Sequence, residues 1–333
     1  MRNKSPKRKV AKMTVKIVSD VSDDVWDTFI DNSPYGSVFS QTSFLKALEV
    51  PHEKLFIELD EKVIASALII EPNSPHFKGP YPYSQYQGIA LPPIIGGIHK
   101  VVHKSLKTIM STLPVLSEKF DNIGLCLHPS LQDLRGFQWF NYHTPERGQF
   151  DIRILYSGII NLEQYSSFDD YLMSIRSVRR QEYKKAKKQS LSMVESHDIE
   201  SFIKLYKLTF ERQSIELDVR ALDTVRNIVN AAISNGIGRL VFCKDCEGSL
   251  HSAIVTLHDK RCTYYMFGAT DPTFRSSGAS TGLILDSIKY SFACNHLRFD
   301  MVGINSPQRG DFKTSFNSEP TPYHFVSLKK QNL

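Results

Sequence analysis

Apolar residues in the first half of the chain change their spacing from segment to segment, and each spacing predicts a different element. Val25, Trp26 and Phe29 lie three and four residues apart after the capping residue Ser22, which predicts a short helix. Alternating apolar runs on either side of Asp60 and Glu61 predict a hairpin. The expected elements are a strand at 13–18, helices after 22 and around 44–48, strands at 54–59 and 63–70, a helix at 98–112 and a strand at 122–127.

The second half of the chain repeats this order of elements. Asp198 caps a predicted helix that carries Phe202, Leu205 and Tyr206 on one face. The following elements are a helix at 221–234, strands at 238–243, 249–257 and 262–268, a helix at 280–293 and a strand at 297–301. Because a helix pair, a hairpin, a long helix and a strand occur twice, we infer an internal duplication. The fold class is therefore α+β, with mixed, mostly antiparallel sheets flanked by helices.

The duplication suggests a division of the 333 residues into two units, each long enough for its own core. We expect a basic tail at 1–12, an N-terminal lobe at 13–160, a basic linker helix within 161–190 and a C-terminal lobe at 191–333. The linker helix is expected over 168–188 and largely exposed, since its few apolar residues offer little to bury.

The charge of the chain indicates what kind of partner it binds, and its cysteine content indicates the compartment in which it works. The net charge is +6, and basic residues cluster in the tail and in the linker helix. Such clusters favour phosphate-bearing partners, including coenzyme A and tRNA, although a solvated tail and helix face give the same pattern. No apolar run is long enough for a membrane span, and none follows the basic N-terminus as in a secretory signal. With five scattered cysteines, these features predict a cytoplasmic protein with reduced thiols.

Three stretches of the chain carry motifs that are specific enough to compare with known families. The most specific is a strand ending Phe299-Asp300-Met301-Val302-Gly303, followed by Phe312-Lys313-Thr314-Ser315-Phe316. That stretch begins at Tyr264-Tyr265-Met266-Phe267-Gly268-Ala269. The other two are Ser33-Pro34-Tyr35-Gly36-Ser37-Val38 leading to Phe44-Leu45-Lys46, and Phe210-Glu211-Arg212-Gln213. These stretches resemble the Fem peptidoglycan aminoacyltransferases (FemABX-like) and the related BioF2-like acetyltransferases of the GNAT superfamily. The resemblance covers nearly the whole chain after the tail and implies two GNAT folds in tandem.

The resemblance also implies roles for individual residues. Lys46 and Arg212 match basic residues that hold the diphosphate of a nucleotide-linked acceptor. Tyr265 and Phe267 match an aromatic strand that faces the reaction cleft. Lys313 matches a lysine that stabilises charge during acyl transfer, and Phe312 would help to keep water from it.

Asp300 is a second candidate for the chemistry, because it ends a strand in the inferred cleft. It could accept a proton from an attacking amine, orient Lys313, or cap the turn at Gly303. The sequence leaves these roles open. The tyrosines Tyr81, Tyr83 and Tyr86 could stack on an acceptor or pack within their own Pro-rich loop.

Residues 275–280 resemble the pyrophosphate loop of acetyltransferases, with Arg275, Gly278 and Ser280 as the candidate donor-phosphate ligands. The segment lies before a predicted helix, whose N-terminal N–H groups suit phosphate. A plain helix-capping turn explains it equally well. Cys243 and Cys246 lack a second ligand pair, so no metal site is expected.

These observations favour an N-acyltransferase with no tightly bound cofactor, using an acyl-CoA or an aminoacyl-tRNA as co-substrate. By the resemblance, its acceptor is an amine on a nucleotide-linked amino sugar or peptide of the cell envelope or a surface polysaccharide. Neither DNA nor a membrane span is expected. The alternatives are an RNA-binding protein that uses the basic helix and a non-catalytic GNAT-like scaffold.

Overall fold

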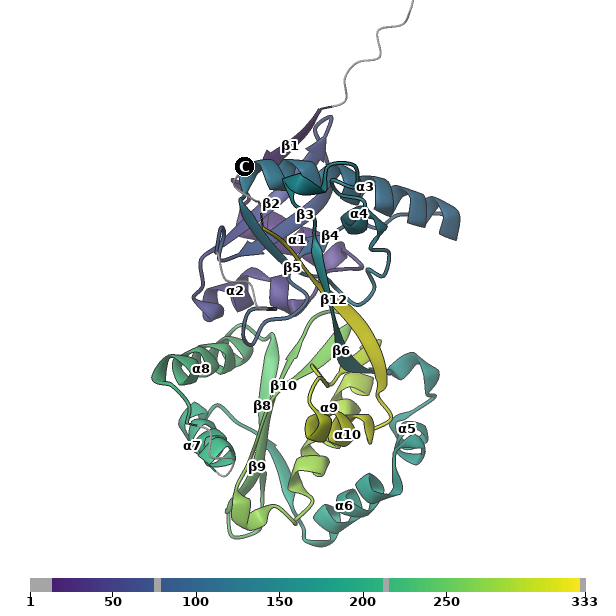
Figure 1. The fold of residues 1–333 in the computed structure, drawn as a ribbon. Helices are drawn as coiled ribbons and strands as arrows, with labels where there is room; N and C mark the ends of the chain where they lie inside the picture. The colour runs from purple at the N-terminus through teal and green to yellow at the C-terminus, as the bar shows by residue number, and fades with distance from the viewer. Residues whose placement is uncertain (1–13, 75–78, 212–215, 330–333) are drawn as a thin grey trace, which may run out of the picture.

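The computed structural model of the chain describes residues 14–74, 79–211 and 216–329. The predicted basic tail and Arg212 therefore lie outside the described residues. The N-terminal lobe contains a four-stranded sheet in the order β1-β2-β3-β4, flanked by three helices (Figure 1). Its elements are β1 (Val15–Val18), α1 (Asp23–Asn32), α2 (Thr42–Leu48), β2 (His52–Leu59), β3 (Lys62–Ile70), β4 (Ile89–Ala90) and α3 (Ile98–Lys119).

The second sheet has eight strands in the order β5-β12-β6-β11-β10-β9-β8-β7. Among these neighbours only β10 and β11 run parallel. The strands are β5 (Asn122–Cys126), β6 (Asp151–Asn161), β7 (Ser192–Glu195), β8 (Gly238–Lys244), β9 (Leu250–His258), β10 (Cys262–Thr270), β11 (Arg298–Asp300) and β12 (Glu319–Lys329).

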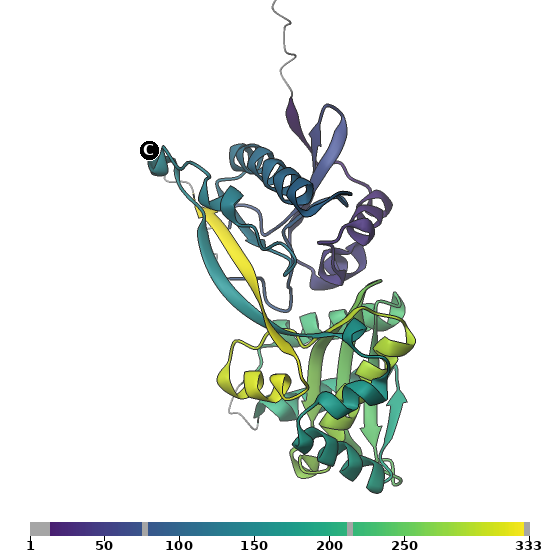
Figure 2. The same ribbon diagram turned by 90° about the vertical axis from the view of Figure 1, so that its right-hand side faces the viewer.

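The long strands β6 and β12 pass from one lobe to the other (Figure 2). Glu319 at the start of β12 lies opposite Ile159 of β6, whereas Lys329 at its end lies opposite Asn122 of β5. The last strand of the chain thus returns to the N-terminal lobe, so the two units share a sheet as well as a linker.

Helices cover both faces of the eight-stranded sheet. Helices α7 (Ile199–Glu211) and α8 (Val219–Ser234) pack on one face, and α9 (Ala279–Ala293) packs on the other. The remaining α-helices are α4 (Arg135–Gln138), α5 (Phe168–Ser174), α6 (Ser177–Lys188) and α10 (Pro307–Thr314). Single turns of 3-10 helix occur at Val38–Ser40, Pro145–Arg147, Leu162–Gln164 and Pro272–Phe274.

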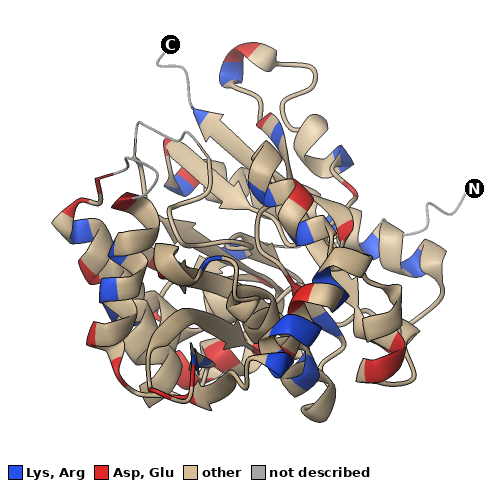
Figure 3. Cartoon of the chain, turned by 90° about the horizontal axis from the view of Figure 1, so that it is seen from below, with Lys and Arg blue, Asp and Glu red and all other residues tan. Residues whose placement is uncertain are grey.

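The structure replaces the single exposed helix expected at 168–188 with two docked helices, α5 and α6. Ile175 between them is extended and only 2% exposed, because it joins the core beneath α9. The Arg180 guanidinium donates to the carbonyl oxygens of Met173 and Ile175, which satisfies backbone groups freed by the break. Ala186 is buried, while the lysines of α6 remain exposed and form a basic surface at the base of the molecule (Figure 3).

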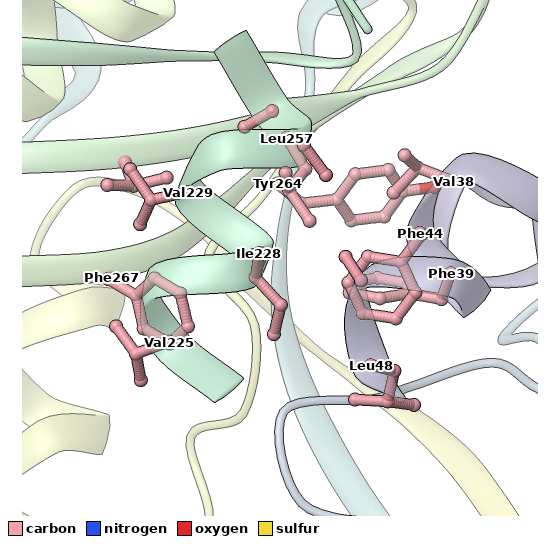
Figure 4. Packing of buried hydrophobic residues seen from close by; sticks show 14 of the residues in the cluster. Val38, Phe39, Phe44, Leu48, Val225, Ile228, Val229, Leu257, Tyr264 and Phe267 are labelled. Atoms are coloured by element: carbon pink, nitrogen blue, oxygen red, sulfur yellow. The ribbon is translucent and has the colours of Figure 1, made fainter. Parts of the chain in front are cut away.

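A continuous apolar core joins the two lobes. Phe39 and Phe44 of the N-terminal lobe pack against Ile228 and Tyr264 of the C-terminal lobe (Figure 4), with the rings of Phe39 and Tyr264 5.0 Å apart. Across the same junction, Arg261 donates to the carbonyl oxygens of Asp31, Ser33 and Gly36. The segment 33–38 therefore serves as the joint between the lobes.

Within the described residues, no helix is both long enough and apolar enough to cross a bilayer.

Candidate functional site

The sheet of the C-terminal lobe opens between β10 and β11. The two strands pair only from Cys262 to Tyr264 of β10, opposite Arg298 to Asp300 of β11. Strand β11 ends at Asp300, but β10 continues to Thr270. Two parallel strands that part in this way leave an opening at their carboxyl ends, where side chains and backbone groups meet a ligand.

A bulge in β10 separates the two aromatic residues that were expected to face this opening together. The pairing of β10 with β9 shifts register between Tyr265 and Phe267, which breaks the alternation that would place them on one face. Tyr265 packs on the α9 side, whereas Phe267 is buried beside Tyr206 of α7. Only Tyr265 lines the opening, so any contact of Phe267 with a substrate would be indirect.

Asp300 holds a short turn that follows β11. Its buried carboxylate accepts hydrogen bonds from the Tyr86 hydroxyl (2.7 Å), the Ser157 hydroxyl and the Val302 N–H (2.8 Å). Burial raises the pKa of Asp300, and these three donors oppose the shift. Val302 has a φ of +50°, a conformation that is rare for a β-branched residue and signals local strain. The carboxylate network thus fixes an unusual backbone turn.

Lys313 of α10 holds the same turn from the other side. Its ammonium donates to the carbonyl oxygens of Val302 and Gly303, the latter at 3.1 Å, and lies 5.3 Å from the centre of the Tyr265 ring. These two bonds use two of the three N–H groups of the ammonium. Burial lowers the pKa of Lys313 to about 8, with Asp300 opposing the shift and Arg309 adding to it.

A cavity of about 400 Å³ lies next to the opening of the sheet. Tyr265 and Phe312 form part of its wall, and so do the three residues of the expected phosphate loop, Arg275, Gly278 and Ser280. The hydroxyls of Ser252, Thr270 and Ser280 meet on another part of the wall at 2.8–3.2 Å from one another. The structure therefore brings the three donor-site candidates together with two of the aromatic candidates, Tyr265 and Phe312, but not with Phe267.

Helix α6 covers the N-terminus of α9 at the edge of this cavity. A Cβ at Gly278 would lie 2.3 Å from the Glu182 carbonyl oxygen, so only glycine permits the approach. The Glu182 carboxylate accepts from the Thr281 hydroxyl and from Arg179 (2.6 Å). The Arg179 guanidinium also stacks 4.9 Å from the centre of the Phe312 ring. A carboxylate of the chain itself, paired with Arg179, thus lies beside the first turn of the helix expected to bind phosphate.

Lys46 lies away from the cavity. Its side chain is 71% exposed and pairs with Asp23 of α1 at 2.8 Å, so it stays a candidate only for an acceptor that reaches along the N-terminal lobe. Cys243 is buried and Cys246 exposed, both as free thiols, and the described residues contain no cluster of metal-ligating side chains.

Sequence reasoning missed three residues that shape the site and named a fourth, Tyr86, without its bond to Asp300. Arg179 and Glu182 were assigned to a solvated linker, and only the packing of α6 on α9 reveals their place. Ser157 carried no signal at all. Tyr86 stood out in a Pro- and Tyr-rich loop, but its hydroxyl binds Asp300 instead of facing an acceptor.

Comparison with known proteins identifies the lobe that carries this site. Residues 174–314 match the family model of the acetyltransferase (GNAT) domain. A search of curated proteins found no match.

Solved structures extend the similarity to the whole chain. FemX shares 14% identity over 93% of this chain and 96% of its own, with a TM-score of 0.68. A tandem GNAT protein from the clavulanic acid biosynthesis pathway covers 97% and 99%, at 9% identity and a TM-score of 0.52. The C-terminal domain of a putative lysylphosphatidylglycerol synthetase from Agrobacterium fabrum covers 93% and 92%, at 8% identity and a TM-score of 0.53. At these identities the comparison shows a shared fold, which confirms the predicted tandem GNAT architecture.

Proposed function

Because residues 174–314 form a GNAT acetyltransferase domain within a chain that has the two-lobed fold of FemX, we propose that the protein is an N-acyltransferase. It moves an acyl or aminoacyl group to the amine of a nucleotide-linked sugar or peptide destined for the cell envelope or a surface polysaccharide. The observation that carries this proposal is the placement of Lys313 and Tyr265 at the opening between β10 and β11.

The proposed reaction is an attack of the acceptor amine on the donor carbonyl carbon. A C–N bond forms, the C–S bond of a thioester or the C–O bond of an aminoacyl ester breaks, and the amine proton passes to the leaving group or to solvent. The carbonyl oxygen carries a negative charge in the tetrahedral intermediate. Lys313 would stabilise that charge with its third N–H group, which does not donate to a carbonyl oxygen of the chain. Donors of this kind typically contribute about 3–4 kcal/mol.

Asp300 acts in this proposal as a positioning residue. Its carboxylate is 2% exposed and already accepts three hydrogen bonds, which leaves little access for an amine. Through the N–H of Val302 it fixes the carbonyl groups that hold Lys313. Of the roles that the sequence left open, orientation of Lys313 has the most support.

The donor is a coenzyme A thioester or a charged tRNA, and the two differ in what they require at the N-terminus of α9. A pyrophosphate bound there would meet the Glu182 carboxylate, whose charge is paired with Arg179, and the guanidinium groups of Arg179 and Arg275 that line the same cavity. The exposed lysines of α6 lie on the same helix as Glu182 and suit a longer polyanion. These contacts suit a coenzyme A thioester and a charged tRNA alike, so both remain candidate donors.

The proposal is tested by incubating the purified protein with labelled acetyl-CoA or with a mixture of labelled aminoacyl-tRNAs. Each donor is offered UDP-linked amino sugars and UDP-linked peptides, and transfer of the label to the acceptor is measured. We expect transfer from one donor class to an acceptor amine. If a folded protein transfers label from neither donor to any acceptor of this panel, the proposed function fails and a non-catalytic scaffold takes its place.

A further inference from the structure

The first turns of α3 extend beyond the body of the N-terminal lobe (Figure 1), and apolar residues there are exposed. Ile98 is 83% exposed and Val102 38%, and Ile95 in the loop before the helix is 86% exposed. Farther along the same helix, Ile109, Leu113 and Leu116 are buried in the lobe core. Positions 98, 102, 109, 113 and 116 follow helical spacing, so one apolar stripe continues from the core out into solvent.

The exposed part of α3 is also strongly basic. Lys100, Lys104 and Lys107 lie on the side of the helix opposite the stripe, and His99 and His103 lie between the two. The first acidic residue of α3 is Glu118. No side chain caps the helix, and its first turn holds no acid. Because a helix N-terminus favours acidic residues and disfavours lysine, this composition opposes the stability of the isolated helix and suggests an external partner.

The loop that leads into α3 is anchored to the N-terminal lobe at Leu91. Leu91 is buried, and its carbonyl oxygen accepts a hydrogen bond from Ser33 at 2.6 Å. Beyond it, Gly96 and Gly97 precede Ile98, and a Cβ at Gly97 would meet no atom within 4 Å. The apolar tip formed by Ile95, Ile98 and Val102 therefore projects from the lobe without a covering element among the described residues.

We propose that this tip, with the lysines behind it, docks the protein on an anionic lipid surface. Apolar side chains that enter the interface and basic groups that face anionic headgroups are the two requirements of a peripheral amphipathic helix. A second copy of the chain is the less suitable occupant, since it would bring two basic helices together. The inference does not depend on the proposed acyl transfer.

The test uses the full chain and vesicles of phosphatidylcholine with or without about 30% phosphatidylglycerol. We expect sedimentation with the anionic vesicles at low salt, and weak binding to phosphatidylcholine alone. Ile95→Ser with Ile98→Ser should abolish most binding, and Lys100→Glu with Lys104→Glu should reduce it by at least tenfold, since each lysine near the surface contributes roughly a fivefold gain. Far-ultraviolet circular dichroism confirms that each variant is folded.

Matched controls are Val25→Ser on α1 and Lys62→Glu on β3, both at exposed positions elsewhere in the N-terminal lobe. These should bind like the wild type. Equal binding by the isoleucine variant and the wild type would overturn the proposal, as would the absence of any preference for anionic vesicles. A wild-type dimer that Ile95→Ser with Ile98→Ser dissociates, seen by analytical ultracentrifugation, would assign the tip to self-association and also overturn it.

Discussion

Asp300 and Lys313 hold the same residue, Val302, from its two ends. The carboxylate accepts the Val302 N–H at 2.8 Å, and the ammonium donates to the Val302 carbonyl oxygen. The two charged side chains do not bond each other, yet each depends on the turn that the other stabilises. A change at Asp300 should therefore move Lys313 without touching it.

The Tyr86 hydroxyl is one of the three donors on which Asp300 relies. Tyr86→Phe removes that donor from a buried carboxylate, and we expect a loss of about 1–3 kcal/mol in the free energy of unfolding. Urea denaturation measures the loss. The control is Tyr142→Phe, at a tyrosine that is 65% exposed. Equal stability of the two variants would show that Asp300 does not need the Tyr86 bond.

The stability of the fold should depend on pH through Lys313. Burial lowers its pKa from 10.5 to about 8, so between these pH values the unfolded chain binds more protons at this lysine than the folded chain does. Its contribution to the free energy of unfolding then rises with pH across that window. We expect wild type to gain stability relative to Lys313→Met from pH 8 to 10.5. Urea titrations at several pH values test this, and a constant difference would contradict the lowered pKa.

The Glu182 carboxylate should lower the affinity for coenzyme A if the pyrophosphate of coenzyme A binds at the N-terminus of α9. Glu182→Gln removes the charge, so coenzyme A should bind about two- to fivefold tighter if its pyrophosphate meets this helix end. Isothermal titration calorimetry compares the variant with wild type and with Glu247→Gln, at an exposed hairpin turn. Unchanged affinity in both variants would place the pyrophosphate elsewhere.

Gly36 tests how tightly the segment 33–38, which joins the lobes, packs against α1 of the N-terminal lobe. A Cβ there would lie 1.9 Å from the Ile30 carbonyl oxygen, while a Cβ at Gly97 meets nothing within 4 Å. We therefore expect Gly36→Ala to destabilise the fold strongly, by more than about 3 kcal/mol, and Gly97→Ala to have little effect. Thermal melts of both variants give the comparison, and similar melting temperatures would contradict the assigned role of this glycine.

Local patterns in the sequence predicted most of the helices and hairpins, because their contacts are close in sequence. The helix after Asp198 begins at Ile199, and Asp198 accepts from the Ser201 N–H as a cap should. The pairing of β12 with β5 joins residues about two hundred positions apart, and no periodic pattern reports such a contact. The sequence patterns therefore did not predict that β12 returns to the N-terminal lobe.

The candidate site was predictable in its parts but not in its arrangement. The resemblance singled out Lys313 and Asp300, yet the strained turn at Val302 that links them depends on Ser157 and Tyr86 from distant segments. Tyr265 and Phe267 looked equivalent because alternation was assumed, and a one-residue bulge separates them. The place of Glu182 follows only from the docking of α6 on α9.

The central claim is that the Lys313 ammonium stabilises the oxyanion formed during acyl transfer. Its most direct test is the steady-state kinetics of Lys313→Met, measured with the donor and acceptor that show transfer, beside Lys289→Met at an exposed position of α9. We expect kcat and kcat/KM of Lys313→Met to fall together by about 10²–10³. Thermal melts should show a folded protein of lower stability, because the carbonyl groups of Val302 and Gly303 lose their donor. Lys289→Met should stay near wild type in both measurements. Near-normal turnover by a folded Lys313→Met protein would contradict the central claim.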